Sequence, residues 1–485
     1  MGILLVACSS LSPAPTASEE AREKGKDLWY VVELLGQRAG YFRIESRPIR
    51  FEGNAAWRTE ETLRNELTRR NGGATETVVV VSRTTLISDA AGNTLRIENV
   101  LDQGGGETSS VVEVNGNKAF LTQETDGDTR RFEMPWDEEV VGPQVADQAI
   151  EAMLAGDSEE VSYQVFSFEA GNRTLEMKAR VIERREDGST IVEQDFVGLG
   201  AKTREVYDRD AILLRQEVGP VVLRLASRAE ALEPLESTLQ AFDRMTVTLD
   251  RPLPMAGELR KASFRLVPRE PGDEISVGGM FIQDGRQRVA LRGGGEILVV
   301  DVPSEPWQDE ANSSFDPRDY LAASSLIEND DPEIQAVARH QAGDLSNPLS
   351  AARRLERWVH ENVAFLGSGI GLATARQTLK SRDGDCTENA FLLAALLRAV
   401  DIPSRVVVGL VSVGSQGQPA VFVPHAWVEG YVGGWVAFDS AVYGPPVDAA
   451  HLSMAKSAGG EEGALLEITV PLLEALGRFD LAWVD

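Results

Sequence analysis

Runs of apolar and β-branched residues, separated by turn residues, dominate the chain from residue 29 to residue 303. Such runs predict strands, and turns such as Asn115-Gly116 and Asp126-Gly127 suit tight hairpins because these residue types accept positive φ. Strands are expected at 75–85, 94–101, 109–114, 118–124, 129–132, 162–169, 174–183, 190–196, 202–206 and 212–217, with more between 246 and 302. Helices do not alternate with them, so the pattern predicts antiparallel meanders rather than βαβ units.

A change of composition at residues 304–316, which hold Pro, Asn, Ser and Asp but few apolar residues, predicts a linker. Helical patterns follow it: Asp331-Pro332 can cap and open one helix, and another is expected over 349–363. The sequence therefore predicts an α+β protein in which a large β-rich region (29–303) precedes a C-terminal domain (317–485). A short helix near 144–155 leaves open a division of the β-rich region into two subdomains, with the break near 144–160.

The chain begins with a short apolar segment, Met1 to Ala7, followed by Cys8. Leu5-Val6-Ala7-Cys8 resembles the lipobox of bacterial lipoproteins, in which the signal peptidase cuts before a cysteine that takes a lipid. The segment is too short for a full signal peptide and lacks a preceding Lys or Arg, which fits a start codon assigned too late. We therefore expect 1–7 to be a truncated signal-like segment, Cys8 the lipidation site and 8–28 a flexible tether. The alternative is a short apolar tip without this role.

Acidic residues outnumber basic ones by 76 to 48, which gives the 485-residue chain a formal net charge of −28. Such a surface repels the phosphates of nucleic acids, so nucleic acid is excluded as a partner. No apolar run is long enough to predict a membrane-spanning helix. The only two cysteines, Cys8 and Cys386, exclude a disulfide framework. The four histidines are scattered and form no cluster with metal-ligand spacing, so no metal and no cofactor are predicted.

The segment around Cys386 carries the first chemical signal. Residues 381–385 form a polar turn, and the apolar run that follows predicts a buried helix ending at Asp401 and Pro403. Cys386 would then lie at or near the helix N-terminus, where unpaired N–H groups and the helix dipole favour a thiolate and an oxyanion. A small buried structural cysteine is the alternative, but the polar residues on both sides of Cys386 argue against it.

A thiol nucleophile needs a base, and His425 has the best context of the four histidines. His340 and His360 lie in polar helical contexts, and His451 lies in an irregular region rich in Ala, Gly and Ser. His425 lies on a predicted strand at 421–432, and Asp439 ends the short strand that follows it. On its own, a strand histidine is more often structural than catalytic, so its spacing to Asp439 matters.

Strand pairing can bring His425 and Asp439 together. Opposed residues share a face, so a register that pairs His425 with Asp439 also pairs Val428 with Val436. This register requires an odd-length loop or a bulge between the strands. Asp439 would then accept a hydrogen bond from one imidazole nitrogen and leave the other facing Cys386.

Three motifs in order resemble the core of the bacterial transglutaminase-like superfamily: Gly384-Asp-Cys-Thr-Glu388 with its helix, Pro424-His-Ala-Trp427, and Trp435-Val-Ala-Phe-Asp439. The resemblance covers about residues 315–445. It implies a papain-like α+β core and a Cys-His-Asp triad, which map onto the Cys, His and Asp of the three motifs. Trp427 shares a strand face with His425 by alternation, where it would either line a cleft or fill the core.

The resemblance implies acyl transfer on amide bonds through a thioester at Cys386. Hydrolysis, as in a peptidase or amidase, is favoured over protein crosslinking because nothing in the sequence marks an amine site. The expected partner is a protein or peptide substrate of the cell envelope, reached from a lipid anchor on the periplasmic or exterior side. If the lipobox is spurious, a secreted or cytoplasmic protein is the alternative. A second alternative is an envelope-anchored binding or scaffold protein in which the β-rich region carries the function.

Overall fold

The structure is a computed structural model that describes residues 26–71, 74–102, 107–125, 127–137, 139–168, 172–197, 201–235, 246–254, 257–269, 277–304, 306–308, 316–324, 326–364, 373–413, 417–442, 447–458, 472, 475 and 477–484. The chain divides into two compact units between residues 241 and 242. Cys8 and the segment 1–7 lie outside the described residues, so their role stays a prediction. The first strand begins at Lys26, so the predicted tether 8–28 extends into it.

The first unit is an antiparallel sheet with 14 strands in its described residues. These are β1 (Lys26–Leu34), β2 (Gln37–Phe51), β3 (Asn54–Asn71), β4 (Ala74–Asp89), β5 (Thr94–Asp102), β6 (Glu107–Asn115), β7 (Lys118–Thr125), β8 (Asp128–Pro135), β9 (Glu160–Ser167), β10 (Arg173–Arg184), β11 (Thr190–Phe196), β12 (Ala201–Tyr207), β13 (Leu213–Val218) and β14 (Val221–Ala226). Burial alternates along strands such as β10, because successive side chains point to opposite faces. The predicted large antiparallel β region is confirmed.

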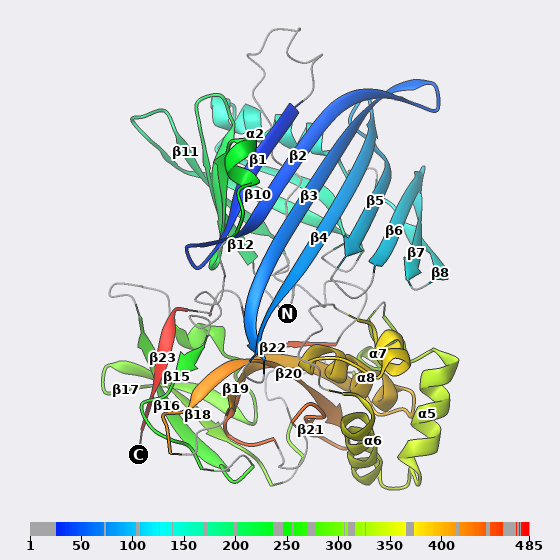
Figure 1. The fold of residues 1–485 in the computed structure, drawn as a ribbon, viewed down its shortest axis with the longest axis vertical. Helices are drawn as coiled ribbons and strands as arrows, with labels where there is room; N and C mark the ends of the chain where they lie inside the picture. Colours follow the sequence, from blue (N-terminus) through cyan, green and yellow to red (C-terminus); the bar gives the residue numbers. More distant parts are fainter. Residues whose placement is uncertain are drawn as a thin grey trace. The chain divides into compact units, whose positions relative to one another are not determined.

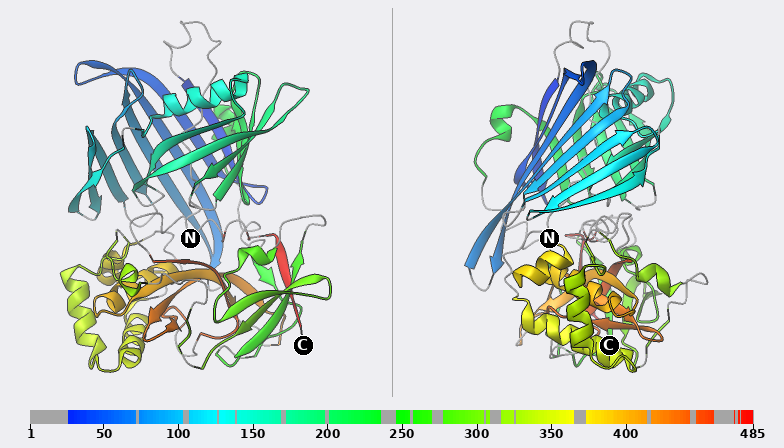
Figure 2. Two further views of the ribbon diagram at one scale, coloured as in Figure 1. Left: turned by 180° about the vertical axis from the view of Figure 1, so that it is seen from behind. Right: turned by 90° about the vertical axis from the view of Figure 1, so that its right-hand side faces the viewer.

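The two meanders of this unit are parts of one sheet. Strands β1–β8 and β9–β14 each pair in chain order, and β1 pairs with β14 between the two series. The helix α2 (Pro143–Ala155) connects the series and lies against one face of the curved sheet (Figure 1, Figure 2). A short helix, α3 (Arg228–Ala231), follows β14. The break considered near 144–160 therefore does not divide the unit, because the β1–β14 pairing closes the gap that α2 opens in the sequence.

The second unit contains two smaller sheets and the helices α5 (Pro332–Ala342), α6 (Pro348–Asn362), α7 (Ala375–Ser381) and α8 (Cys386–Arg398). One sheet holds β15 (Val247–Thr248), β19 (Ser404–Val413), β20 (Val421–Tyr431), β21 (Trp435–Phe438) and β22 (His451–Ser457). The other holds β16 (Lys261–Pro268), β17 (Gln287–Arg292), β18 (Gly295–Asp301) and β23 (Phe479–Trp483). Two 3₁₀ turns, η1 (Val277–Met280) and η2 (Pro317–Tyr320), complete the described elements. The predicted α+β class is confirmed.

The linker predicted at 304–316 does not separate the two units. β16, which precedes it, pairs with β23 at the end of the chain, and β15 pairs with β20. Residues 246–302 therefore belong to the second unit, and the division lies near residue 241. The sequence could not show this, because these strands have the same alternating pattern as the earlier ones and their partners lie far along the chain.

Helix α8 is the centre of the second unit's core. Its residues from Glu388 to Arg398 are all buried, and they pack among α5, α6, α7 and the five-stranded sheet. The helices gather on one side of this sheet (Figure 1). Because α8 is buried from Glu388 onward, its first residue, Cys386, is held by a rigid element. Among the helices in the described residues, none combines the length and hydropathy needed to cross a bilayer.

Candidate active site

Cys386 is the first residue of α8, as the sequence predicts. The preceding residue, Asp385, adopts an extended conformation and accepts a hydrogen bond from the Thr387 N–H at 2.7 Å. In return, the Asp385 N–H donates to Glu388 Oε2 at 2.9 Å, which completes a capping box. Cys386 itself is only partly buried, and it packs against the helical core. The local sequence Asp-Cys-Thr-Glu therefore starts the helix at the thiol and keeps the thiol at its accessible end.

The carboxyl group of Glu388 supports this helix end by accepting the hydrogen bond from the Asp385 N–H. Burial and the adjacent Asp385, with which it shares a hydrogen bond, raise the pKa of Glu388 to about 10. The raised pKa favours the neutral form of the Glu388 carboxyl group. Gly384 is required by the same packing, because a Cβ there would lie 2.5 Å from the Cβ of Glu388. Packing and hydrogen bonding thus explain why glycine and glutamate occupy the two ends of the motif Gly384–Glu388.

His425 lies on β20, which runs between β19 and β21. Its Nε2 and the Asp439 Oδ2 are 2.8 Å apart, and its side chain also interacts with Cys386. Burial alone would lower the pKa of His425, but the charge and hydrogen bond of Asp439, together with Cys386, raise it to about 10. Since Nε2 faces Asp439, Nδ1 is the ring nitrogen left to exchange a proton with the thiol.

Asp439 directly follows β21, and its carboxylate is buried. Its Oδ1 accepts hydrogen bonds from the N–H groups of Ala441 at 3.0 Å and Val442 at 3.1 Å. Its own N–H donates to Glu356 Oε1 on α6 at 2.8 Å. Burial would raise the pKa of Asp439, but the charge and hydrogen bond of His425 hold it well below its usual range. The lowered pKa favours the ionised carboxylate, which the turn after β21 holds, while α6 holds the backbone of Asp439.

The predicted strand register is wrong, although the odd-length loop is confirmed. Val428 pairs with Phe438 rather than with Val436, and the loop between the strands is Val432-Gly433-Gly434. Both registers keep the same parity, so the face predictions survive the shift. His425 and Asp439 meet because Asp439 leaves the strand and turns its carboxylate toward the ring, a turn that strand pairing cannot describe.

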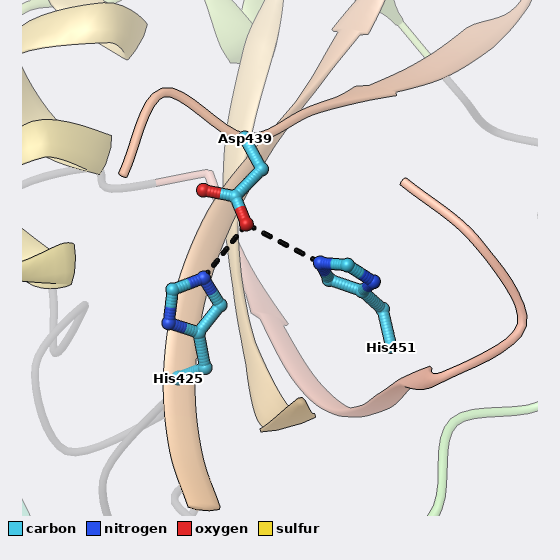
Figure 3. Close-up of side chains that lie close together, drawn as sticks. All are labelled: His425, Asp439 and His451. Carbon is cyan, nitrogen blue, oxygen red and sulfur yellow. Dashed lines mark hydrogen bonds and ion pairs between the residues drawn. The ribbon is translucent and has the colours of Figure 1, made fainter. Parts of the chain in front are cut away.

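His451, which the sequence reading left aside, is the residue it missed. It is the first residue of β22 and is 7 % exposed. Its Nε2 lies 3.2 Å from Asp439 Oδ2, the same oxygen that His425 contacts (Figure 3). Its Nδ1 lies 3.3 Å from Asp448 Oδ1. The spacing Asp448-x-x-His451 was the available signal, but the surrounding small residues hid the strand. His340 and His360, which lie on α5 and α6, are both exposed.

Trp427 belongs to the core rather than to a cleft wall. It is 1 % exposed and packs with Trp307, Val407 and Trp435. Its ring also stacks near that of His425, with the centroids 6.2 Å apart and an interplanar angle of 21°. Of the two roles that the sequence left open, core packing is the one observed, and the contact limits the tilt of the imidazole.

A metal would find three donors in this place. One ligand atom each from His425, Asp439 and His451 lies within 4.8 Å of the others. Hydrogen bonds already join all three side chains and account for their closeness. The expectation of a site without metal stays a prediction.

Comparison with known families supports the assignment of this region. Residues 335–440 match the family described as the transglutaminase-like superfamily. This match covers α5 to β21 and includes Cys386, His425 and Asp439. The chain therefore contains a transglutaminase-like domain, and the family points to cysteine-based catalysis. No curated protein sequence matches the chain significantly.

Solved structures show weaker likenesses. A candidate cysteine protease from Cytophaga hutchinsonii is 18 % identical, with 46 % of this chain and 82 % of that chain covered and a TM-score of 0.29. The periplasmic domain of TgpA from Pseudomonas aeruginosa is 19 % identical, with 40 % and 85 % covered and a TM-score of 0.27. A β-barrel-like protein of the DUF1849 domain from Brucella abortus is 12 % identical, with 42 % and 96 % covered and a TM-score of 0.30. At these TM-scores, the activities of the neighbours do not transfer to this chain.

Proposed function

We propose that Cys386, His425 and Asp439 form the catalytic triad of an enzyme that transfers acyl groups from amide bonds through a thioester. One observation carries the proposal: the imidazole of His425 contacts the Asp439 carboxylate at 2.8 Å through Nε2 while its side chain interacts with the thiol at the start of α8. This is the order nucleophile, base and orienting carboxylate. The family match over residues 335–440 supports the same chemistry.

The reaction begins with proton transfer from the Cys386 thiol to Nδ1 of His425. The thiolate attacks the carbonyl carbon, a C–S bond forms, and the carbonyl oxygen becomes an oxyanion. When the intermediate collapses, the C–N bond breaks and the imidazolium gives its proton to the leaving amine. Water, deprotonated by His425, then cleaves the thioester and returns the free thiol. The raised pKa of His425 favours the imidazolium that the first half needs.

The oxyanion needs hydrogen-bond donors close to the thiol. Asp385 already accepts from the first-turn N–H groups of Thr387 and Glu388. The N–H of Cys386 makes no hydrogen bond to any described residue, so it is the free donor at this helix end. This N–H belongs to the same residue as the attacking sulfur, so it lies near the carbon under attack and can reach the oxyanion that forms there.

Hydrolysis is the proposed outcome, on a protein or peptide substrate of the cell envelope. The lipid anchor at Cys8 would hold the enzyme there, facing the periplasm or exterior. A peptidase or amidase and a crosslinking enzyme share the thioester and differ only in whether water or an amine takes the acyl group. An acyl adduct is first trapped on Cys386 from an envelope extract, and its release is then followed with and without an added primary amine. The mass of the released product distinguishes hydrolysis from transfer to the amine.

Alkylation of Cys386 by iodoacetamide tests the triad without a known substrate. The rate is followed by mass spectrometry of the peptide that contains Cys386, so that Cys8 does not contribute. At pH 6 to 7 we expect Cys386 to react at least tenfold faster than glutathione, and His425→Ala to remove most of this advantage. His340→Ala, a change at an exposed histidine on α5, is the matched control and should have no effect. Equal rates in wild type and His425→Ala would contradict the proposal.

The scaffold alternative rests on the size and independence of the first unit. Residues 26–235 form their own 14-stranded sheet in the part of the chain that the structure describes. If Cys386 reacts no faster than glutathione, the proposed catalytic function is rejected, and a binding role of the β unit becomes the leading hypothesis. A reactive Cys386 leaves the β unit as an accessory to the enzyme.

A further inference from the structure

Asp439 receives two imidazole groups rather than one. His425 on β20 and His451 on β22 both reach Oδ2, at 2.8 Å and 3.2 Å (Figure 3). Figure 3 shows dashed lines from the two rings meeting at the same carboxylate oxygen. A carboxylate that only oriented His425 would need one of these contacts. The second contact therefore requires its own explanation.

The contact completes the set of donors around Asp439. Oδ1 is held by the N–H groups of Ala441 and Val442. Without His451, Oδ2 would have His425 as its single donor in a buried place, although a carboxylate oxygen accepts two. Four donors from three segments fix the plane of the carboxylate. The direction in which it presents Oδ2 to His425 is then fixed as well.

His451 is itself held firmly. Its Nδ1 faces Asp448 Oδ1 at 3.3 Å, and Asp448 is anchored by the N–H groups of Gly257 at 2.7 Å and Ala450 at 2.9 Å. The ring also meets Trp427 edge to face, with centroids 5.4 Å apart. Backbone pairing with Val411 on β19 fixes its position along the strand. A side chain constrained in so many ways can transmit its position to Asp439.

We propose that His451, held by Asp448, is a positioning residue that fixes Asp439 and thereby aims His425 at Cys386. The role rests on the proposed triad, since it acts only through Asp439. A buried histidine with a purely structural role would satisfy its hydrogen bonds and support the fold, but it would have no coupling to the reactivity of the thiol. The two roles therefore differ in a measurable way.

A double-mutant cycle separates them in the full chain. The readout is the rate of iodoacetamide alkylation at Cys386 near pH 7. His451→Leu should lower this rate about tenfold, the scale of one hydrogen bond to a charged group. His451→Gln, whose amide can still donate to Asp439, should stay within about threefold of wild type. In an Asp439→Asn background, His451→Leu should change the rate less than about twofold, because the path through Asp439 is already broken.

Three results would overturn the role of His451. These are an unchanged rate in His451→Leu, an equal loss in the Asp439→Asn background, or no rescue by glutamine. If His451→Leu does not fold, Asp448→Asn provides the second variant, and its expected loss is about threefold because the ring keeps its contact to Asp439. The underlying triad is tested separately by His425→Ala. A loss there with none in the His451 and Asp448 variants defeats only this inference, whereas no loss in His425→Ala defeats both.

Discussion

Two buried carboxyl groups, one in each unit, behave in opposite ways. Glu205 in the β unit is fully buried and accepts hydrogen bonds from Thr203, Tyr207 and Gln216. Burial outweighs these neutral donors, so the pKa of Glu205 is raised. Asp439 in the second unit is equally buried, yet the charge and hydrogen bond of His425 lower its pKa.

The difference shows what an ionised buried carboxylate requires. Neutral donors satisfy the oxygens but do not offset the loss of hydration of the charge, whereas an imidazolium does. Glu205 is therefore a hydrogen-bonded member of a polar interior, and Asp439 is one half of an ion pair. Only the second arrangement can hold a base in its protonated form next to a thiol.

The largest effect is expected from Asp439→Asn, which replaces a carboxyl group with a carboxamide. Asp439→Asn removes the charge that stabilises the His425 imidazolium, so alkylation of Cys386 should slow about a hundredfold or more, the range of general acid–base effects. Glu205→Gln is the matched control and should leave the rate unchanged. A comparable loss in both variants would mean that the rate reports general destabilisation rather than the ion pair.

Opposite pH dependence of stability is the next expectation. The lowered pKa of Asp439 means that its contribution is present above the unfolded value of about 4 and is lost as pH falls. The raised pKa of Glu205 means that the folded state binds more protons, so its contribution falls as pH rises above about 4. The stability of wild type relative to Asp439→Asn should therefore rise from pH 3 to 5. The stability of Glu205→Gln relative to wild type should rise from pH 4 to 7.

The stability difference between wild type and Asp439→Asn should also change at alkaline pH. Because the pKa of His425 is raised to about 10, its contribution is full below the unfolded value of about 6.5 and is lost as pH rises toward 10. The advantage of wild type over Asp439→Asn should thus decline again above pH 6.5. Hydrogen–deuterium exchange read by peptide measures each unit separately. A stability difference between wild type and Asp439→Asn that stays constant from pH 3 to 10 would contradict the ion pair.

The sequence predicted the parts of this comparison unevenly. Cys386 at a helix start follows from the polar turn before an apolar run, and the hairpin turns follow from Asn-Gly and Asp-Gly pairs. Both signals are local, so propensity and pattern suffice to find them. The meeting of His425 with Asp439 was also expected, although through the wrong register.

What the sequence could not predict depends on contacts between distant segments. The place of β16 beside β23 has no local signal, so the domain boundary was set too late in the chain. His451 appeared irregular because its strand is rich in small residues, and only the sheet brings it to Asp439. Glu205 reads as an ordinary polar position of an alternating strand, yet in the folded sheet it is fully buried.

A smaller effect is expected at Glu356, which supports Asp439 from α6. Its Oε1 accepts the Asp439 N–H at 2.8 Å, and its Oε2 accepts from Arg353 at 2.8 Å. Glu356→Leu leaves that buried N–H without a partner, which should destabilise the second unit by about 1–3 kcal/mol and slow alkylation a few-fold. Glu356→Gln keeps an acceptor and should cost less. Glu361→Leu, at an exposed position of the same helix, is the control for urea unfolding, and an equal cost there would contradict the assignment.

The smallest effect is expected from removing the hydroxyl of Tyr30, and its contrast with Tyr207 sharpens the account of the β unit. The Tyr207 hydroxyl donates to Glu205 Oε2 at 2.8 Å, so Tyr207→Phe leaves a buried carboxyl oxygen short of a donor and should cost about 1–3 kcal/mol. The Tyr30 hydroxyl is buried with no hydrogen-bond partner among the described residues, so Tyr30→Phe should change stability by less than about 0.5 kcal/mol or increase it. Neither variant should alter alkylation of Cys386. Urea unfolding of the pair decides the point: an equal cost for both would mean that the hydroxyl of Tyr30 has a polar partner after all, and that the interior of the β unit is as fully paired as the surroundings of Asp439.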